Sequence, residues 1–484
     1  MKSGNFIQAI WIGLLTLTAI GVGTRAGFRN ADEDKKGAAW AVNEAVSWGA
    51  CSDAWHLSST ELDRVCGTLN VPMQRMRQQQ AGEVVKLAMT KLPATDHKMG
   101  SLILVSGGPG IPGVGLSLAQ SAETSKLRKH FDIIAYDPRG VGQSEPKIRC
   151  TTDPKIGPYS SEWLRSCTTM TKESFISHLS TLDAVDDLEG IRVALGEEKI
   201  TLLAYSYGTA VAQLYAEHYP QNVRAMVLDG VVDLSENYAA WRVNQSRGIN
   251  LAFYRFARYC AGIAGCPLTK SPVEALDAYR TLLSRASTGA IRKPDGQPVS
   301  ADQIHGYTQS ALFWDRNWPE LARTLTELRQ LKVSVQTAEL LDTPQFYKQD
   351  EAKASLVITC SDYGPLPNVA PESILRGTFV TISEEATAEL ADRTCAGWPF
   401  GARMTAATPS RDKRLPSLLF VAQTGDPTTP YGNAVKMSAA FGSPLLVREG
   451  NGHTFVLAEG FRCIDDKVVN YLLEPTKPVS DAYC

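Results

Sequence analysis

The sequence lacks the features that mark several large classes of protein. Its 484 residues contain no block of Lys or Arg and carry a formal net charge of −2, which argues against a nucleic-acid partner. The ten cysteines form no C-x-x-C and no zinc-like spacing with the seven histidines, so no metal site is expected. Internal repeats and low-complexity stretches are also absent. With 44% hydrophobic and 21% charged residues, the composition is that of a soluble globular protein.

The first 26 residues have the pattern of a secretory signal peptide. Lys2 precedes an apolar run at residues 6–22, and small residues follow up to Ala26. The run is shorter than the roughly 20 residues that a membrane-spanning helix needs, so we favour cleavage after Ala26. An uncleaved membrane anchor stays open as the alternative. We therefore expect a secreted or periplasmic protein.

Ten cysteines behind such a segment predict structural disulfides in an oxidising compartment. They fall into five consecutive couples, and we expect nearest neighbours to pair, although spacing alone leaves other connectivities open. The couples are Cys51/Cys66, Cys150/Cys167, Cys260/Cys266, Cys360/Cys395 and Cys463/Cys484.

From about Val84, short apolar runs that end in turn residues alternate with amphipathic stretches. Expected strands are 102–105, 131–136, 200–204, 225–228, 415–422 and 445–447, and expected helices include 182–195, 208–218, 273–287 and 318–331. This alternation predicts a mostly parallel sheet with helices on both faces, and functional loops at the carboxyl ends of its strands.

The alternation stops near Asp233 and resumes after about Thr405. The stretch 233–405 is richer in helical periods and aromatic residues, so we interpret it as a mainly helical cap inserted into the sheet domain. The sheet domain then consists of residues 27–232 and 406–484.

Residues 204–208 (AYSYG) approximate the G-x-S-x-G turn that lifts a nucleophilic serine above a sheet. An apolar strand precedes Ser206 and an amphipathic helix follows it, which makes Ser206 the candidate nucleophile. An acid and a base are then needed downstream. Asp426 directly follows an apolar strand, and His453 lies in a glycine-rich loop after the last one, in the order that this turn requires.

An earlier apolar strand ends in residues 106–110 (SGGPG). Glycines at that place let a backbone N–H approach a reacting oxygen, so this loop is the expected second part of an oxyanion hole. A phosphate-binding loop is disfavoured because the G-x-x-x-x-G-K-[ST] pattern is missing.

Together these residues resemble the proline iminopeptidase and tripeptidyl aminopeptidase group of α/β-hydrolases, which are serine peptidases. The shared motifs are residues 107–110, 137–144 (DPRGVGQS), 186–189 with Arg192, 205–209, 228–231, 424–427 and 452–453. Residues 48–72 and 463–484 resemble the secreted tripeptidyl aminopeptidase branch, so the likeness covers nearly the whole mature chain and is weakest in the cap.

The resemblance implies an α/β-hydrolase fold, a triad of Ser206, Asp426 and His453, and oxyanion donors at the N–H groups of Gly108 and Tyr207. Two positions depart from the family pattern. Ala204 replaces the first glycine of the serine turn, and Ile111 replaces the glycine that usually follows GGPG.

These expectations describe a peptidase that acts near a free N-terminus, through an acyl-enzyme and without a cofactor. A carboxylesterase with the same triad is the first alternative, and a catalytically silent binding protein is the second. An aminopeptidase needs an anion for the substrate ammonium group. The candidates in or near the cap are Glu236, Glu320, Glu351 and Asp362.

Overall fold

The computed structural model describes residues 45–55, 57, 63–74, 83–118, 121–153, 155–156, 160–343, 349–365, 395–409 and 412–484. The expected signal peptide at residues 1–26 lies outside the described residues. All described residues belong to one compact unit, Trp40–Cys484. None of the helices in this part of the chain has the length and apolarity that a membrane crossing requires.

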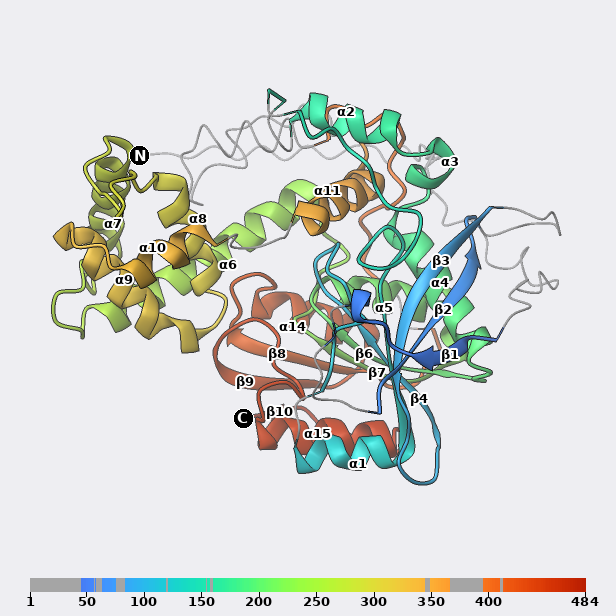
Figure 1. The fold of residues 1–484 in the computed structure, drawn as a ribbon. Coiled ribbons are helices and arrows are strands. Elements are labelled where there is room, and N and C mark those ends of the chain that lie inside the picture. Colours follow the sequence, from blue (N-terminus) through green and yellow to red (C-terminus); the bar gives the residue numbers. More distant parts are fainter. Residues whose placement is uncertain are drawn as a thin grey trace, which may run out of the picture. The chain divides into compact units, whose positions relative to one another are not determined.

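A single sheet of ten strands organises the described chain (Figure 1). Its strands, in spatial order, are β1 (Ser47–Ala50), β2 (Val65–Pro72), β3 (Val84–Leu92), β5 (Phe131–Tyr136), β4 (Gly100–Val105), β6 (Ile200–Tyr205), β7 (Val223–Asp229), β8 (Leu419–Gly425), β9 (Leu445–Asn451) and β10 (Ala482–Tyr483). The pairs β1/β2, β2/β3 and β3/β5 are antiparallel, and every pair from β5/β4 to β9/β10 is parallel. The sheet is therefore mostly parallel, as expected, with an antiparallel edge.

Helices cover both faces of the sheet because its strands are apolar on both sides. In β4, Leu102 and Leu104 pack into one buried cluster, whereas Ile103 and Val105 pack into the other. Helices α4 (Thr181–Ala194), α5 (Tyr207–His218) and α14 (Tyr431–Phe441) contribute to the second cluster, together with the shorter α2 (Ser161–Met170) and α3 (Glu173–Ile176). Helices α1 (Ala122–His130) and α15 (Arg462–Leu473) lie side by side on the opposite face (Figure 1).

The strand expected at residues 415–422 begins later than predicted. β8 spans Leu419–Gly425, and the preceding Leu418 donates its N–H to Ser443 Oγ at 3.1 Å instead of to a strand. Pro416 has no N–H to give to a sheet ladder, which explains why pairing starts beyond it.

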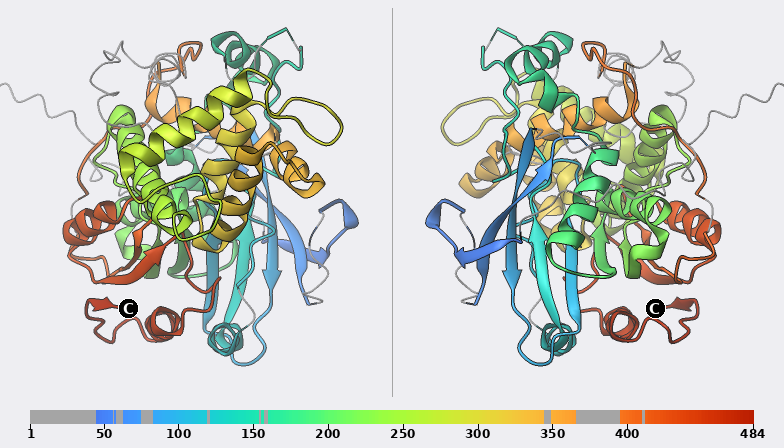
Figure 2. Two further views of the ribbon diagram at one scale, coloured as in Figure 1. Left: turned by 90° about the vertical axis from the view of Figure 1, so that its left-hand side faces the viewer. Right: turned by 90° about the vertical axis from the view of Figure 1, so that its right-hand side faces the viewer.

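Between β7 and β8 the described chain forms helices and no strand of the sheet. These helices are α6 (Tyr238–Cys260), α7 (Pro272–Ser287), α8 (Ala301–Ala311), α9 (Trp318–Gln330), α10 (Val335–Asp342) and α11 (Gln349–Tyr363). A short 3-10 turn, Asp315–Asn317, precedes α9, and two others lie outside this region, at Asp53–Trp55 and Pro220–Asn222. Residues of α6 to α10 build a hydrophobic core of their own. In contrast, α11 packs through Ala354, Val357 and Ile358 into the cluster that contains Ile103 and Val105, which we call the main core. The two views of Figure 2 show these helices gathered beyond one end of the sheet.

All ten cysteines are paired in the structure, and each pairs with its nearest neighbour along the chain. The bridges are Cys51–Cys66, Cys150–Cys167, Cys260–Cys266, Cys360–Cys395 and Cys463–Cys484. Disulfides in this number are typical of extracellular or periplasmic proteins.

Candidate active site

Ser206 sits on a strained turn between β6 and α5. Its φ of 54° and ψ of −125° lie in a region that residues other than glycine rarely adopt, and its N–H donates to the Asp229 carbonyl at 2.9 Å. The turn requires close backbone neighbours: a Cβ on Gly208 would lie 2.6 Å from the Val105 carbonyl oxygen. Ala204 stands where a glycine is usual, and its fully buried methyl group packs in the main core.

Asp426 and His453 follow β8 and β9 and meet beyond the strand ends. His453 Nδ1 lies 3.0 Å from Asp426 Oδ1 and 2.9 Å from Oδ2. The carboxylate also accepts the N–H groups of Thr428 and Thr429, at 2.9 and 2.8 Å, and the Thr429 hydroxyl at 2.9 Å. With both side chains buried, these donors hold an acid that can orient the imidazole and fix its tautomer.

Gly230, at the end of β7, leaves room for the imidazole. A Cβ at this position would lie 3.1 Å from His453 Cε1 and 2.8 Å from Thr454 Cγ2. Among the described residues no hydrogen bond joins Ser206 Oγ to the His453 ring. Such contacts are often long in the absence of substrate and shorten in the reacting complex.

Asp229 links the serine turn to the histidine loop, and the sequence patterns singled it out only as part of a shared motif. Its carbonyl accepts the Ser206 N–H, while its carboxylate accepts the N–H groups of Phe455 and Val456 at 2.6 and 2.9 Å. Burial raises the pKa of Asp229 to about 7, although the two N–H donors act in the opposite direction.

The two expected oxyanion donors lie on the cavity that contains Ser206, since Gly108 and Tyr207 both line it. Gly108 has a φ of 115°, and a Cβ on it would lie 2.7 Å from the Gly110 nitrogen, so only glycine fits. Tyr207 is the first residue of α5, where a backbone N–H has no acceptor within the helix. Ile111, the departure from the family loop, has its carbonyl held by Ser106 Oγ at 2.9 Å.

Two of the four candidate acids, Glu236 and Asp362, line the same cavity as Ser206. Glu236 Oε1 accepts Asn244 Nδ2 at 2.9 Å, whereas its buried Oε2 has no hydrogen-bond partner. Burial, followed by the neighbouring Asp233, raises the pKa of Glu236 to about 7. A buried carboxyl with an unpartnered oxygen can bind a donor or a cation that enters the cavity.

The other two acids are not among the residues that line the cavity. Glu320, on α9, accepts Gln336 Nε2 at 3.2 Å and lies 3.6 Å from Arg323. Glu351, on α11, presents its backbone carbonyl to Gly110. From sequence position alone, Glu320 and Glu351 could not be distinguished from Glu236 as candidates for the ammonium site.

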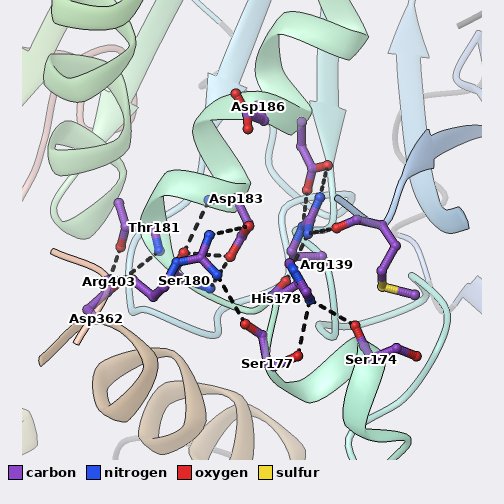
Figure 3. A network of polar contacts seen from close by, with 12 residues as sticks. Arg139, Ser174, Ser177, His178, Ser180, Thr181, Asp183, Asp186, Asp362 and Arg403 are labelled. Atoms are coloured by element: carbon purple, nitrogen blue, oxygen red, sulfur yellow. Dashed lines mark hydrogen bonds and ion pairs between the residues drawn. The ribbon is translucent and has the colours of Figure 1, made fainter. Parts of the chain in front are cut away.

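Asp362 joins α11 to the start of α4, as Figure 3 shows. Its carboxylate accepts the Thr181 N–H at 2.7 Å and the Thr181 hydroxyl at 2.6 Å, and that hydroxyl lies 2.6 Å from Tyr207 Oη. Burial raises the pKa of Asp362 to about 7 against these hydrogen bonds. Arg403 reinforces the junction, since it lies 3.2 Å from Asp183 and donates its N–H to the Asp362 carbonyl (Figure 3).

Aromatic side chains form one wall of the cavity. Trp241 and Tyr363 stack with their ring centroids 6.4 Å apart, and Tyr238 packs against both. An apolar wall beside buried carboxylates suits a ligand with an apolar side chain and a cationic group. Among the described residues, no group of three His, Cys, Asp or Glu side chains could hold a metal ion.

The chain matches known proteins over most of its length. Residues 100–460 match the family described as alpha/beta hydrolase fold. Serine protease Hip1 of Mycobacterium tuberculosis is 32% identical, over 92% of this chain and 91% of that protein. Carboxylesterase B of the same species is 30% identical (90% and 89%), and tripeptidyl aminopeptidase of Streptomyces coelicolor is 27% identical (94% and 90%).

Proposed function

The chain belongs to the α/β-hydrolase fold family and is a serine hydrolase, and from that premise we propose that it is a peptidase acting on substrates with a free N-terminus. Relatives named serine protease and tripeptidyl aminopeptidase support a peptide substrate. The five disulfides support a role outside the cytosol, and we propose export through the N-terminal segment with cleavage after Ala26.

In the proposed reaction, Ser206 is the nucleophile and His453 is the base. His453 Nε2 takes the proton of Ser206 Oγ, while Asp426 holds Nδ1 and stabilises the imidazolium that forms. The serine oxygen attacks the substrate carbonyl carbon, and the same proton then passes to the leaving amine. Water, deprotonated by His453, hydrolyses the acyl-enzyme and regenerates Ser206.

The N–H groups of Gly108 and Tyr207 are the proposed donors to the oxyanion of each tetrahedral intermediate. The position of Tyr207 supports this role, because the first residue of α5 has an N–H without an acceptor inside the helix and follows Ser206 at the positive end of the helix dipole. Loss of one such donor typically lowers kcat by about 100- to 1,000-fold.

The preference for a free N-terminus depends on one observation, the unpartnered carboxylate oxygen of Glu236 on the Ser206 cavity. An incoming ammonium group would pair with it and stabilise its ionised form. Asp362 lies on the same cavity, but Thr181 already occupies both of its oxygens, so Glu236 is the better candidate.

The test compares a good peptide substrate with its N-acetylated form in the wild-type protein and in Glu236→Gln. Removing one partner of a buried charge pair typically costs about 2–5 kcal/mol. In the wild-type protein, kcat/KM should therefore be at least about 30-fold higher for the free amine than for the acetylated peptide. In Glu236→Gln the two peptides should have nearly equal kcat/KM. Glu320→Gln is the matched control, because that acid pairs on α9 away from the cavity, and it should leave the ratio unchanged.

Equal rates for blocked and free peptides in the wild-type protein would exclude the aminopeptidase and leave the serine hydrolase. The carboxylesterase alternative has specific support in the 30% identical relative of that name. Turnover of short-chain esters without measurable hydrolysis of free-amine peptides would favour it.

A further inference from the structure

His453 is held by the cap as well as by Asp426. Its backbone N–H donates to the Phe313 carbonyl at 2.9 Å, and its own carbonyl accepts the indole N–H of Trp314 at 2.9 Å. The Phe313 ring stands edge-on to the imidazole, with ring centroids 5.8 Å apart. Two consecutive cap residues thus bond both backbone polar groups of the proposed base, and its carbonyl also accepts the Thr454 hydroxyl at 2.7 Å.

The two cap residues lie on a firmly anchored segment. They connect α8 to the 3-10 turn Asp315–Asn317, between Leu312 and Trp318, which are both buried in the separate core of α6 to α10. Trp314 also forms an isolated β-bridge with Gly452, and the Arg316 guanidinium stacks over its indole at 4.7 Å while pairing with Glu459.

The chain leaves the sheet just before His453, since β9 ends at Asn451. His453 follows Gly452, whose φ of 154° lies in a range that other residues rarely adopt. A loop of this kind needs outside contacts to hold one geometry, and a displacement of about 1 Å at a catalytic group can cost roughly 100-fold in rate.

We propose that Trp314 is a positioning residue for His453, so that the cap takes part in the reaction by orienting the base as well as by covering the cavity. The Trp314 indole N–H fixes the His453 carbonyl, the Phe313 carbonyl fixes its N–H, and the Phe313 ring limits rotation of the imidazole. The imidazole then points its Nδ1 at Asp426 and its Nε2 toward Ser206. This inference rests on the proposed role of His453 as base.

The main variant is Trp314→Phe, which removes the indole N–H and keeps an aromatic ring. Trp318→Phe is a matched control, because the Trp318 indole nitrogen is buried without a hydrogen-bond partner on the same cap. Trp314→Phe should lower kcat by about 10- to 100-fold with KM changed by less than about 2-fold. Trp318→Phe should leave both constants near wild type.

A pH profile separates positioning from general loss of structure. The acidic limb of kcat/KM reports the ionisation of the base in the free enzyme, so it should move in Trp314→Phe and stay in place in Trp318→Phe. If Trp314→Phe fails to fold, Phe313→Leu provides the second variant, because it removes the ring contact and keeps the backbone carbonyl. A fall in kcat at unchanged KM is expected there too.

Wild-type kcat and pH profile in a folded Trp314→Phe, or in Phe313→Leu where that variant replaces it, would overturn the inference. An equal loss of kcat in Trp318→Phe would also overturn it, since the effect would then come from the packing of the cap. Failure of the proposed function is recognised separately, because Ser206→Ala and His453→Ala would then retain activity and the wild-type protein would not react with a fluorophosphonate probe.

Discussion

The two sides of the candidate site are supported by different parts of the molecule. On the serine side, the turn at Ser206 is made by β6 and α5 and is fastened to the end of β7 through the Asp229 carbonyl. On the histidine side, the backbone of His453 is fastened to Phe313 and Trp314, which belong to helices with a separate core. The proposed nucleophile is thus built into the sheet, whereas the proposed base is held by both sheet and cap.

This difference indicates what the cap contributes beyond covering the cavity. Mutations in the sheet core should affect stability and activity together, because the serine turn and the fold depend on the same strands. Mutations in the cap beside His453 should affect activity more than stability, because α6 to α10 carry their own hydrophobic core.

The largest effect is expected on the serine side, from Ser206→Ala. Alanine has nearly the same volume as serine and accepts the same strained turn, so the thermal midpoint should stay within a few degrees of wild type. Activity should fall by about four to six orders of magnitude, as in other serine triads. Turnover of the purified variant near the wild-type rate would remove Ser206 from the mechanism.

The serine side could be predicted from the sequence because its determinants are local. The strand, the small residues and the helix that create the turn all lie within 200–218, and Asp426 and His453 each follow a recognisable apolar strand. The parallel sheet and most of its helices were predicted for the same reason. Membership of the α/β-hydrolase family is confirmed by the match over residues 100–460.

The supports of the site could not be predicted, because they depend on contacts between distant parts of the chain. Trp314 and His453 are 139 positions apart, and Asp362 and Thr181 are 181 apart. No sequence pattern distinguishes a Glu236 that faces the cavity from a Glu320 that pairs on a cap helix. The late start of β8 depends on Pro416 and on the hydrogen bond from the Leu418 N–H to Ser443 Oγ, a contact that periodicity does not detect.

The serine side also contacts the cap, because Asp362 on α11 bonds Thr181 beside Tyr207. Asp362→Asn tests how strongly this contact depends on the protonation of the carboxyl group. The folded pKa of Asp362 is raised to about 7, against roughly 3.9 in the unfolded chain, so the folded state binds more protons between these values. Its contribution to stability is therefore complete below about pH 4 and is lost as the pH rises to about 7. Over that window the loss amounts to at most about 4 kcal/mol.

Asp362→Asn should remove this part of the pH dependence, since an amide of the same shape does not titrate. The measurement is the urea midpoint of wild type and variant at several pH values from 4 to 8, with Asp277→Asn on the exposed face of α7 as control. Parallel curves for wild type and Asp362→Asn would show that the carboxyl is ionised throughout and does not couple the cap to α4.

Gly230→Ala tests whether the residue that follows β7 confines the imidazole of His453. The added Cβ would lie 3.1 Å from His453 Cε1 and 3.1 Å from Thr429 Oγ1, at a φ of 70°. Gly196→Ala is a close control, because Gly196 has the same φ and nothing within 4 Å of its Cβ position. The control should lose about 1–2 kcal/mol of stability from backbone strain alone, with full activity.

Gly230→Ala should lose a further ~1–3 kcal/mol and about 10- to 100-fold in kcat, because the imidazole has to move. Thermal unfolding and steady-state kinetics on both variants give the comparison. Equal kcat in the two variants would mean that Gly230 does not confine His453.

The smallest difference is expected between two disulfides of the cap region, one in the core of α6 to α10 and one at the main core. Cys260–Cys266 closes a span of 6 residues inside the core of α6 to α10, whereas Cys360–Cys395 closes a span of 35 residues at the main core. All four cysteines are at most 9% exposed, so the change in solvation on Cys→Ala replacement is similar. Chain entropy then predicts losses of about 2 and about 4 kcal/mol, a difference of roughly 1.6 kcal/mol.

The two disulfides should also differ in their effect on kcat, with the larger loss again expected from removal of Cys360–Cys395. Cys360 lies two residues before Asp362, whose carboxylate holds Thr181 beside Tyr207, so loss of the longer bridge should loosen the serine side and lower kcat. Loss of Cys260–Cys266 should lower the unfolding midpoint slightly and leave kcat unchanged, because α6 keeps its contacts in its own core. The double Cys→Ala variants, compared by urea unfolding and by kcat, test both statements. A larger loss of stability or of kcat from the shorter bridge would mean that α6 to α10 support the sheet core, and that the two sides of the site are not held separately.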